Sequence, residues 1–343
     1  MTELSDELMA RPKRSATQWL QYGFVRLGIL PLLMVIAVII FASLSKHFLS
    51  GQNMLNVARQ STYLTMVAMG QMLTLLTGGF DLSVGTILAV TSVVGAMIMV
   101  AMAGADPSAP ALAIAVGMAG GILAGLSIGV ANGIGVAYLG VSPFMMTLGM
   151  ASVGFGIALY LTGGVPVYGM PSAFGKVFGF GQWLGIPMPV YVTVVLIVVM
   201  YVLLNWTRMG RYLYAIGGNI KASMLSGINT RFNLFMAYVL CGGLTAVSGI
   251  ILTARLETGE ANIGATMPLD SIAACVIGGV SLRGGSGRLG NVVLGAIFIG
   301  LVQNGMNLAR MQSYLQTVVI GLLLIVAVVA DQLRQRFIAG LRD

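Results

Sequence analysis

The chain has 343 residues, of which 57% are hydrophobic and only 8% charged, and its mean hydropathy is +0.94. Soluble domains carry roughly 25% charged residues, so a soluble fold of this chain would leave large apolar areas facing water. The 47 glycines lie inside runs of Leu, Ile, Val and Met, where small residues let membrane helices pack closely. The composition therefore predicts an all-α polytopic membrane protein.

Ten apolar stretches predict about ten transmembrane helices, because about 20 residues cross the ~30 Å hydrocarbon layer. The expected spans are 27–44, 57–77, 84–104, 111–138, 144–163, 189–206, 232–253, 267–281, 289–307 and 314–332. The stretch 111–138 exceeds one crossing, and 267–281 is short enough to be a half-helix. Residues 1–26 and 333–343 are expected to be cytoplasmic tails of one transmembrane domain, 27–332.

The basic residues test this topology, because loops on the cytoplasmic side carry excess Lys and Arg. With ten spans and the N-terminus inside, 13 of the 18 basic residues fall inside: Arg11, Lys13, Arg14, Arg26, Arg208, Arg211, Lys221, Arg231, Arg283, Arg288, Arg334, Arg336 and Arg342. Only Lys46, Lys176, Arg255 and Arg310 fall outside, and Arg59 lies within a span. This split predicts an even number of spans with both termini in the cytoplasm. The net charge of +8 comes from Lys and Arg residues that flank apolar runs, and this pattern does not indicate nucleic-acid binding.

Enzyme chemistry finds little support in the sequence. The single histidine, His47, excludes His-based metal clusters and Ser/His/Asp triads, and no GxxxxGK[ST] phosphate loop occurs. Cys241 and Cys275 lie in apolar stretches and are expected to be buried and unpaired. The GSGRLG run at 285–290 fits a dinucleotide fingerprint, but it links two apolar stretches and is expected to be a tight turn. No metal or cofactor is expected on this chain.

Two acids, Asp81 and Asp270, are the candidates for charge inside the membrane, where ionisable groups mark pathways or partners. Each precedes an apolar run, so each is either a helix N-cap or part of a pathway. Polar side chains within spans either line a path for a neutral polar solute or hold helices together. The candidates for the path are Asp81, Ser83, Thr147, Asp270, Gln303, Asn304 and Asn307, with Thr65 and Gln71 as further polar positions.

Two loops are long enough to have a function. Segment 163–187, expected outside, is rich in Gly and Pro and is predicted to hold a short surface helix or a partner contact. Segment 207–231, expected in the cytoplasm, is predicted to contain a short amphipathic helix with Asn219 as N-cap and Gly227 as its stop. A helix tethered between two spans at the cytoplasmic face can transmit force from a soluble partner.

Motifs along nearly the whole chain resemble the ribose-type sugar permeases of ATP-binding cassette (ABC) importers. They are TGGFDLSVG at 77–85, SPFMMTLG at 142–149, the loop from 210 to 228, LDSIAA at 269–274, IGGVSL followed by GG at 277–285, and QNGMNL at 303–308. The resemblance implies the ABC importer permease fold and makes 219–227 the coupling helix that docks into an ATPase. The implied coupling residues are Arg211, Gly217, Gly218, Asn219, Lys221, Ala222, Leu225, Ser226 and Gly227. Ile220 and Met224 stand where the family often has an acid and an Arg.

The same resemblance implies the partners: a second permease subunit, identical or different, a cytoplasmic ATPase that holds the ATP and Mg, and a periplasmic sugar-binding protein. It places the chain in the bacterial inner membrane and implies import of a ribose- or xylose-like monosaccharide or a related polyol. Two alternatives remain open at this point. One is an ion-coupled secondary transporter acting alone, and the other is an ABC permease for an amino acid or an autoinducer-type signal.

Overall fold

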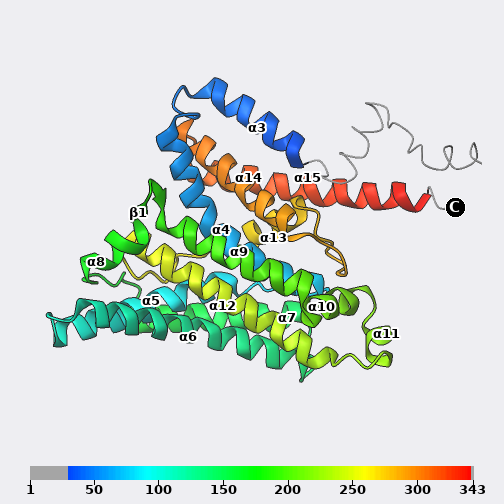
Figure 1. The fold of residues 1–343 in the computed structure, drawn as a ribbon, viewed down its shortest axis with the longest axis horizontal. Helices are drawn as coiled ribbons and strands as arrows, with labels where there is room; N and C mark the ends of the chain where they lie inside the picture. Colours follow the sequence, from blue (N-terminus) through cyan, green and yellow to red (C-terminus); the bar gives the residue numbers. More distant parts are fainter. Residues whose placement is uncertain (1–29, 341–343) are drawn as a thin grey trace, which may run out of the picture.

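A computed structural model of the chain describes residues 30–340. The predicted tail 1–26, with Arg11, Lys13, Arg14 and Arg26, lies outside the described residues, as does Arg342 at the other end. The described part of the chain is almost entirely helical (Figure 1). The described residues form a bundle of long helices with a small hairpin and several short helices at its two ends.

The elements follow the predicted apolar stretches closely. In chain order they are α3 (Leu30–Leu44), α4 (Gly51–Leu76), α5 (Val84–Ala105), α6 (Pro110–Ala137), α7 (Pro143–Thr162), α8 (Ser172–Phe174), the π-helix η1 (Gly175–Gly179), β1 (Gln182–Trp183), β2 (Ile186–Pro187), α9 (Met188–Trp206), α10 (Arg208–Gly218), α11 (Ile220–Leu225), α12 (Thr230–Leu256), α13 (Met267–Ile277), α14 (Leu289–Leu308) and α15 (Ser313–Gly340). The short surface helix expected in 163–187 is confirmed as α8 and η1, and the β1–β2 hairpin in the same segment was not predicted.

A helix lies at each of the ten stretches predicted to span the membrane, but six are long and apolar enough to do so by length and composition: α5, α6, α7, α9, α12 and α14. The described parts of α3, α13 and α15 that are apolar are shorter. Helix α4 has the length but carries polar residues such as Asn53 and Arg59 in its first half. The described structure thus supports a polytopic bundle, while the count of ten crossings stays a prediction.

The second half of helix α4 is the centre of the bundle. Every residue from Ser61 to Leu76 is buried, and the helix contacts α9, α12, α13 and α14. A helix enclosed by protein on all sides does not need an apolar lipid-facing stripe, since its polar groups find partners on neighbouring helices. Polar residues of the second half, such as Gln71 and Thr74, therefore lie in the core, whereas the first half is only partly buried.

Glycines bring α5, α6 and α12 into close contact. A Cβ at Gly129 in α6 would lie 3.0 Å from the Cα of Gly242 in α12, and one at Gly121 would lie 3.1 Å from the Cα of Gly95 in α5. Backbones approach this closely only where side chains are absent. The abundance of glycine in the sequence therefore serves helix packing, as the composition predicts.

The half-helix expected in 267–281 is α13. After α12 the chain turns back along α5, where the Glu260 amide donates to the Ser92 hydroxyl (3.1 Å) and Gly264 packs against Gly85. Helix α13 therefore starts inside the bundle, and its 11 residues extend only ~16 Å at 1.5 Å per residue. A loop through 278–288 then leads to α14.

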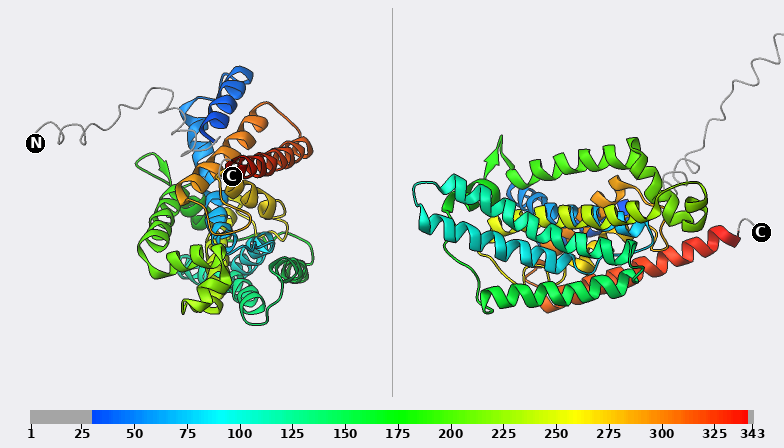
Figure 2. Two further views of the ribbon diagram at one scale, coloured as in Figure 1. Left: turned by 90° about the vertical axis from the view of Figure 1, so that its right-hand side faces the viewer. Right: turned by 90° about the horizontal axis from the view of Figure 1, so that it is seen from below.

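The bundle has two distinct ends. Helices α10 and α11 lie at one end, and α8 and the β1–β2 hairpin lie at the opposite end (Figures 1 and 2). The described chain also begins, in α3, and finishes, in α15, toward the α10–α11 end. This arrangement agrees with an even number of crossings.

Candidate functional site

Helices α10 and α11 form the segment predicted to receive a soluble partner. Helix α10 buries Gly210, Leu213 and Ile216 on one face. Helix α11 has the predicted caps: the Asn219 side chain accepts a hydrogen bond from the Ala222 amide (3.0 Å). Gly227, at φ +79°, ends the helix in the left-handed conformation that favours glycine. The short helix expected between Asn219 and Gly227 is therefore confirmed.

The surface of this segment is exposed and mixes basic with apolar side chains. Leu225 is 91% exposed, with Ile220 and Met224 also exposed nearby. The exposed residues among the predicted coupling set are Arg211, Gly218, Asn219, Lys221, Ala222, Leu225, Ser226 and Gly227. An apolar side chain so fully exposed on a six-residue helix contributes nothing to the fold of this chain, so it is available to a partner.

The α10–α11 segment is joined to the core through a glycine contact. Gly217 lies against the backbone at Leu76, where α4 ends, and against Gly285 in the α13–α14 loop, because a Cβ at Gly217 would overlap Leu76 O and Gly285 N. The Gly285 amide donates to Leu76 O (2.9 Å), and the Tyr214 hydroxyl donates to Gly287 O (2.9 Å). Burial raises the pKa of Tyr214. We call this three-way contact of Leu76, Gly217 and Gly285 the glycine junction.

Asp81 lies directly beyond the glycine junction, in the turn between α4 and α5, and is fully buried. Its Oδ1 accepts from the Ser83 amide (2.8 Å) and the Ser83 hydroxyl (2.6 Å), while Asn132 of α6 donates to Ser83 Oγ (2.7 Å) and to both carboxylate oxygens (3.4 Å each). With its amide oriented to satisfy both atoms, Gln71 pairs with the backbone N–H and C=O of Asp81 (3.0 and 3.1 Å). This Asp81 cluster ties the turn to α4 and α6.

Some polar atoms of this region have no partner among the described residues. They are Asn132 Oδ1 and the Tyr238 hydroxyl, both buried. Buried polar groups are normally hydrogen-bonded, and exceptions call for an explanation. A polar solute or water would satisfy these atoms if the turn moved.

A second polar cluster surrounds Asp270. Asp270 Oδ2 accepts from the Thr266 hydroxyl (3.0 Å) and from Gln303 Nε2 on α14 (3.5 Å). Asp270 is 5% exposed and Gln303 is half-buried. The structure thus brings together Asp270 and Gln303, two residues of the predicted path, at the start of the half-helix α13. Broken helices that place polar groups inside a bundle are a recurring feature of transporter binding sites.

Neither acid is the helix N-cap that was one interpretation of the sequence. The residue before α5 is Ser83, and Asp81 instead holds the turn two residues earlier. The N-cap position of α13 is Thr266, and Asp270 lies in the first helical turn. The N-cap interpretation was wrong because local sequence pattern does not reveal that both turns are folded into the protein interior.

The remaining predicted path residues have other surroundings. Asn304 forms a reciprocal pair with Asn53 of α4, with each Nδ2 donating to the other Oδ1 at 2.9 and 3.0 Å. The Thr147 hydroxyl donates to Pro143 O of its own helix (2.8 Å). Asn307 is exposed near the end of α14 and accepts from Gln316 (2.8 Å). The geometry of Asn304 is that of an interhelical contact, which was the other interpretation of the sequence.

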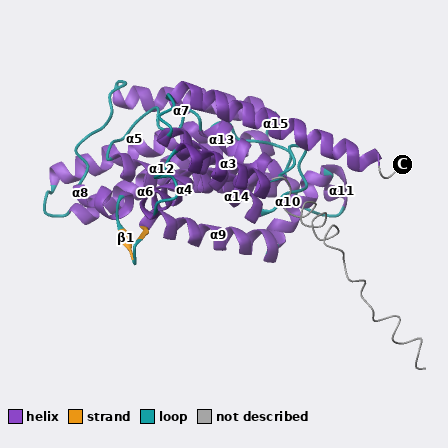
Figure 3. Ribbon diagram, turned by 90° about the horizontal axis from the view of Figure 1, so that it is seen from above, coloured by secondary structure: helices purple, strands orange, loops and turns teal. Residues whose placement is uncertain are grey.

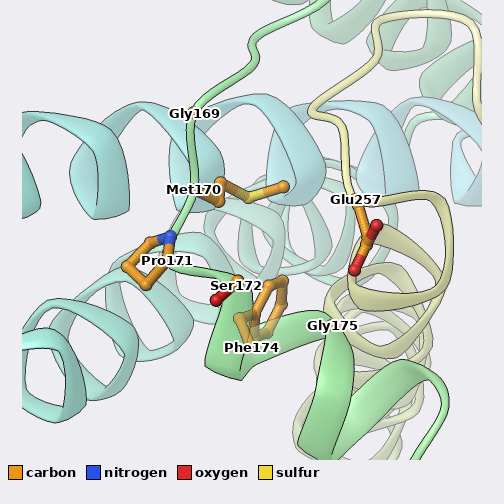
Figure 4. Close-up of a pocket in the computed structure, with 7 residues that line it drawn as sticks. All are labelled: Gly169, Met170, Pro171, Ser172, Phe174, Gly175 and Glu257. Atoms are coloured by element: carbon orange, nitrogen blue, oxygen red, sulfur yellow. The ribbon is translucent and has the colours of Figure 1, made fainter.

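A shallow pocket of about 190 Å³ lies at the opposite end of the bundle. It is lined by Gly169, Met170, Pro171, Ser172, Phe174, Gly175 and Glu257 (Figure 4). Glu257 is exposed and adopts φ +57° at the end of α12, and its carboxylate lies beside Gly175. The pocket therefore combines an exposed carboxylate with a rim from the short helices α8 and η1.

The other chemical candidates have structural roles. Cys241 and Cys275 are buried and unpaired, as predicted, and Cys275 Sγ donates to Ala68 O (3.2 Å). The 285–290 run forms the end of the loop from α13 and the start of α14, and Gly285 and the preceding Gly284 have positive φ. Among the residues whose side chains are described, 30–329, no group of His, Cys, Asp and Glu could hold a metal ion.

Comparison with known proteins agrees with the resemblance that the sequence motifs indicate. Residues 53–328 match the family model described as branched-chain amino acid transport system / permease component. The chain belongs to this permease family. It is 40% identical to the ribose import permease protein RbsC of Bacillus subtilis over 87% of this chain and 90% of that protein. It is 36% identical to the D-allose transport system permease protein AlsC of Escherichia coli, over 94% and 95% of the two chains.

The galactose/methyl galactoside import permease protein MglC of Salmonella typhimurium is a further relative, at 35% identity over 95% of this chain and 98% of that protein. No solved structure matches the chain. These relatives confirm the resemblance to ribose-type sugar permeases of ABC importers. As a member of the permease family, the chain is a multi-pass membrane protein. It is a transport subunit and not an enzyme.

Sequence reasoning missed several residues of the site. Asn132, Tyr238 and Thr266 contribute to the two clusters or lie beside them, and Asn53 pairs with Asn304. Asn132 had a usable signal, since it is an amide side chain inside the apolar stretch 111–138. Tyr238 and Thr266 had none, because a hydroxyl near a span end fits an ordinary surface position equally well.

Proposed function

We propose that the chain is the membrane permease of an ABC importer that carries a small sugar into the cytoplasm, driven by a separate ATPase. On this proposal the α10–α11 end and both termini are cytoplasmic, and the chain resides in the bacterial inner membrane. The relatives named for ribose, D-allose and galactose support a monosaccharide of this kind. The observation that carries the proposal is the exposed helix α11 and its connection to the core through Gly217.

The coupling step begins at α11. A groove on the ATPase would cover Leu225, Met224 and Ile220, and the exposed Arg211 and Lys221 would meet acidic groups at its rim. When ATP draws two ATPases together, α11 and α10 would move as one unit. Because Gly217 contacts the backbone at Leu76, this movement would reach the turn that holds Asp81.

The path would pass between the Asp81 and Asp270 clusters. Asp81, Ser83 and Asn132 are sealed from solvent in this conformation. Displacement of the turn would open the cluster and present its amide, hydroxyl and carboxylate groups to sugar hydroxyls. Gln303 and Asp270 would offer a second set of hydrogen-bonding groups, while Thr147 and Asn307 are peripheral candidates. Hydroxyl-rich solutes are recognised by such groups because a site built for hydrogen bonds rejects solutes that leave it unpaired.

The remaining partners would contact other surfaces. A second permease subunit, identical or different, would complete the path, and a periplasmic binding protein would deliver the sugar to the α8 end. The exposed carboxylate of Glu257 in its pocket would receive a basic side chain of that protein (Figure 4). ATP and Mg would bind to the ATPase, with no cofactor on this chain.

Reconstitution tests the proposal. The chain is incorporated into liposomes alone or with a candidate ABC ATPase and sugar-binding protein from its source organism, and uptake of labelled ribose, D-allose and galactose is measured. We expect uptake only when the binding protein is outside the liposomes and the ATPase and ATP are inside. Uptake by the chain alone under a proton or sodium gradient would establish a secondary transporter instead. ATP-driven uptake of labelled amino acids without sugar uptake would reject the sugar assignment but retain the importer.

A further inference from the structure

Helix α9 carries an apolar surface of the bundle that is not needed for the proposed transport. Its buried residues, such as Pro189, Thr193, Met200 and Leu204, share one face that packs toward α4. The opposite face exposes Val194, Val195, Val198 and Val199. Helix α9 lies at the margin of the bundle in the views of Figures 2 and 3, with its outer face unpartnered.

Aromatic pairs bracket this apolar face. At one end Trp183 and Tyr191 have ring centroids 5.4 Å apart, and the Tyr191 hydroxyl donates to Trp183 O (2.8 Å). At the other end Tyr201 and Trp206 are 6.1 Å apart. Trp183 is 62% exposed and Trp206 is 72% exposed. Trp and Tyr with exposed rings gather at the two levels where a membrane meets water.

The length of helix α9 fits a bilayer. The 19 residues of α9 extend ~28 Å at 1.5 Å per residue, against ~30 Å for the hydrocarbon layer. No residue between Lys176 and Arg208 carries a charge, and these two basic residues lie just beyond the aromatic pairs. A surface for a soluble protein would gain from polar groups along its length, whereas a lipid-facing surface excludes them.

The hairpin that carries Trp183 adds an independent observation. Trp183 pairs with Ile186, so Leu184 and Gly185 form a two-residue loop, and both have positive φ (+50° and +76°). Such loops favour Asn, Asp or Gly at the first position, because other residues are strained there. Leu184 is nevertheless present and is 80% exposed. A strained, exposed leucine at a hairpin tip is explained if its side chain leaves water for lipid.

We propose that the β1–β2 hairpin is a membrane anchor that inserts Trp183 and Leu184 into the headgroup region, and that the outer face of α9 contacts lipid rather than a second permease subunit. The hairpin projects from the bundle beside the start of α9 (Figure 3). Trp183 and Trp206 then mark the two interfaces of the bilayer. Any subunit contact must use another face of the bundle.

The chain has only three tryptophans, Trp19, Trp183 and Trp206, which makes the proposal testable by fluorescence. The full-length variants W19F/W206F and W19F/W183F each retain one tryptophan near α9. Each is reconstituted into phosphatidylcholine vesicles with bromine atoms either near the headgroup or deep in the acyl chains. We expect both tryptophans to be quenched more strongly by the shallow bromines than by the deep ones.

Two control variants in a tryptophan-free background calibrate the measurement. Val198→Trp, at the middle of the exposed face, should be quenched more by deep bromines, and Phe174→Trp, at a buried position, by neither lipid. If Trp183 resists both lipids but is quenched by aqueous acrylamide, the hairpin stands in water and the anchor is rejected. If Trp206 and Val198→Trp resist both lipids and acrylamide, the α9 face is covered by protein, and the lipid assignment is overturned.

Discussion

The Gly285 amide donates a hydrogen bond to the Leu76 carbonyl across 2.9 Å, and this bond joins the α13–α14 loop to the end of the central helix α4. Gly217 at the end of α10 lies against the same two residues. A contact made of backbone atoms from three segments has no flexible side chain to absorb displacement. Movement of α10 is therefore passed to α4 and to the loop together.

Gly217→Ala should break this contact. The added methyl group would overlap Leu76 O and Gly285 N, so α10 must shift, and overpacking of this kind costs about 1–3 kcal/mol. We expect a lower unfolding temperature in detergent and loss of ATP-driven uptake in reconstituted vesicles.

Gly218→Ala is the matched control for this prediction. Nothing lies within 4 Å of the position that a Cβ at Gly218 would occupy, and its φ is not positive. Its stability should stay within about 0.5 kcal/mol of the parent, as for ordinary surface changes. Equal effects of the two substitutions would show that the backbone contact at Gly217 is not what limits coupling.

Leu225→Asp should separate folding from partner binding. Leu225 is almost fully exposed, so its replacement leaves no cavity and should not change the unfolding temperature of the isolated chain. At the centre of a docking surface, the aspartate would weaken binding of the ATPase by more than about 1 kcal/mol, the threshold that marks a residue important for binding.

Co-purification of the ATPase and ATP-driven uptake measure this change. Lys46→Asp is the control. Lys46 is exposed just after α3, away from α11, so reversing its charge should leave ATPase binding normal. Retention of ATPase by Leu225→Asp at the parent level would place the docking surface elsewhere than α11.

Elements whose cause is local could be predicted from the sequence. Apolar stretches located the long helices, and the caps of α11 followed from Asn219 and Gly227 because both act on their own neighbours. The glycine junction could not be predicted, because Leu76 and Gly285 are brought together by the fold and meet through backbone atoms that every residue has.

The site was predicted in part for the same reason. Asp81 and Asp270 stood out as acids within an apolar chain, but their partners Asn132 and Thr266 come from the fold. The hairpin was missed because Leu184-Gly185 lacks the Asn-Gly or Asp-Gly signal of a two-residue loop. If Leu184 serves the membrane, that departure from turn chemistry has a functional cause.

The Asn53–Asn304 pair should contribute to stability as a unit. Asn304→Ala removes two hydrogen bonds and leaves Asn53 Oδ1 without its donor inside the bundle, at a cost of about 1–3 kcal/mol. Asn53→Ala should cost more, since Asn53 also donates to Phe48 O. In a double-mutant cycle measured by denaturation in detergent, the combined variant should lose less than the sum of the two. Strict additivity would mean that the amides do not interact in solution.

Asp81→Ala should be more damaging than the same change at Asp106, although the two aspartates have nearly identical local bonds. Asp106 Oδ1 accepts from the Ser108 amide and hydroxyl at 2.9 and 2.6 Å, as Asp81 does from Ser83. Only Asp81 is buried and is also reached by Asn132 of α6. Removing it leaves buried donors unpaired, at about 1–3 kcal/mol, whereas exposed donors at Ser108 turn to water.

Uptake and stability measured together decide what the Asp81 cluster does. If the cluster holds the turn shut, Asp81→Ala should reduce ATP-driven uptake and raise the ATP hydrolysis that is not matched by transport, because the turn that α10 moves is then linked to α6 only through the Asn132–Ser83 bond. Asp81→Asn keeps one acceptor for Ser83 and should fall between the parent and the alanine variant in both measurements. Asp106→Ala should match the parent in both. A loss of stability in Asp81→Ala with fully coupled uptake would assign the cluster to folding alone.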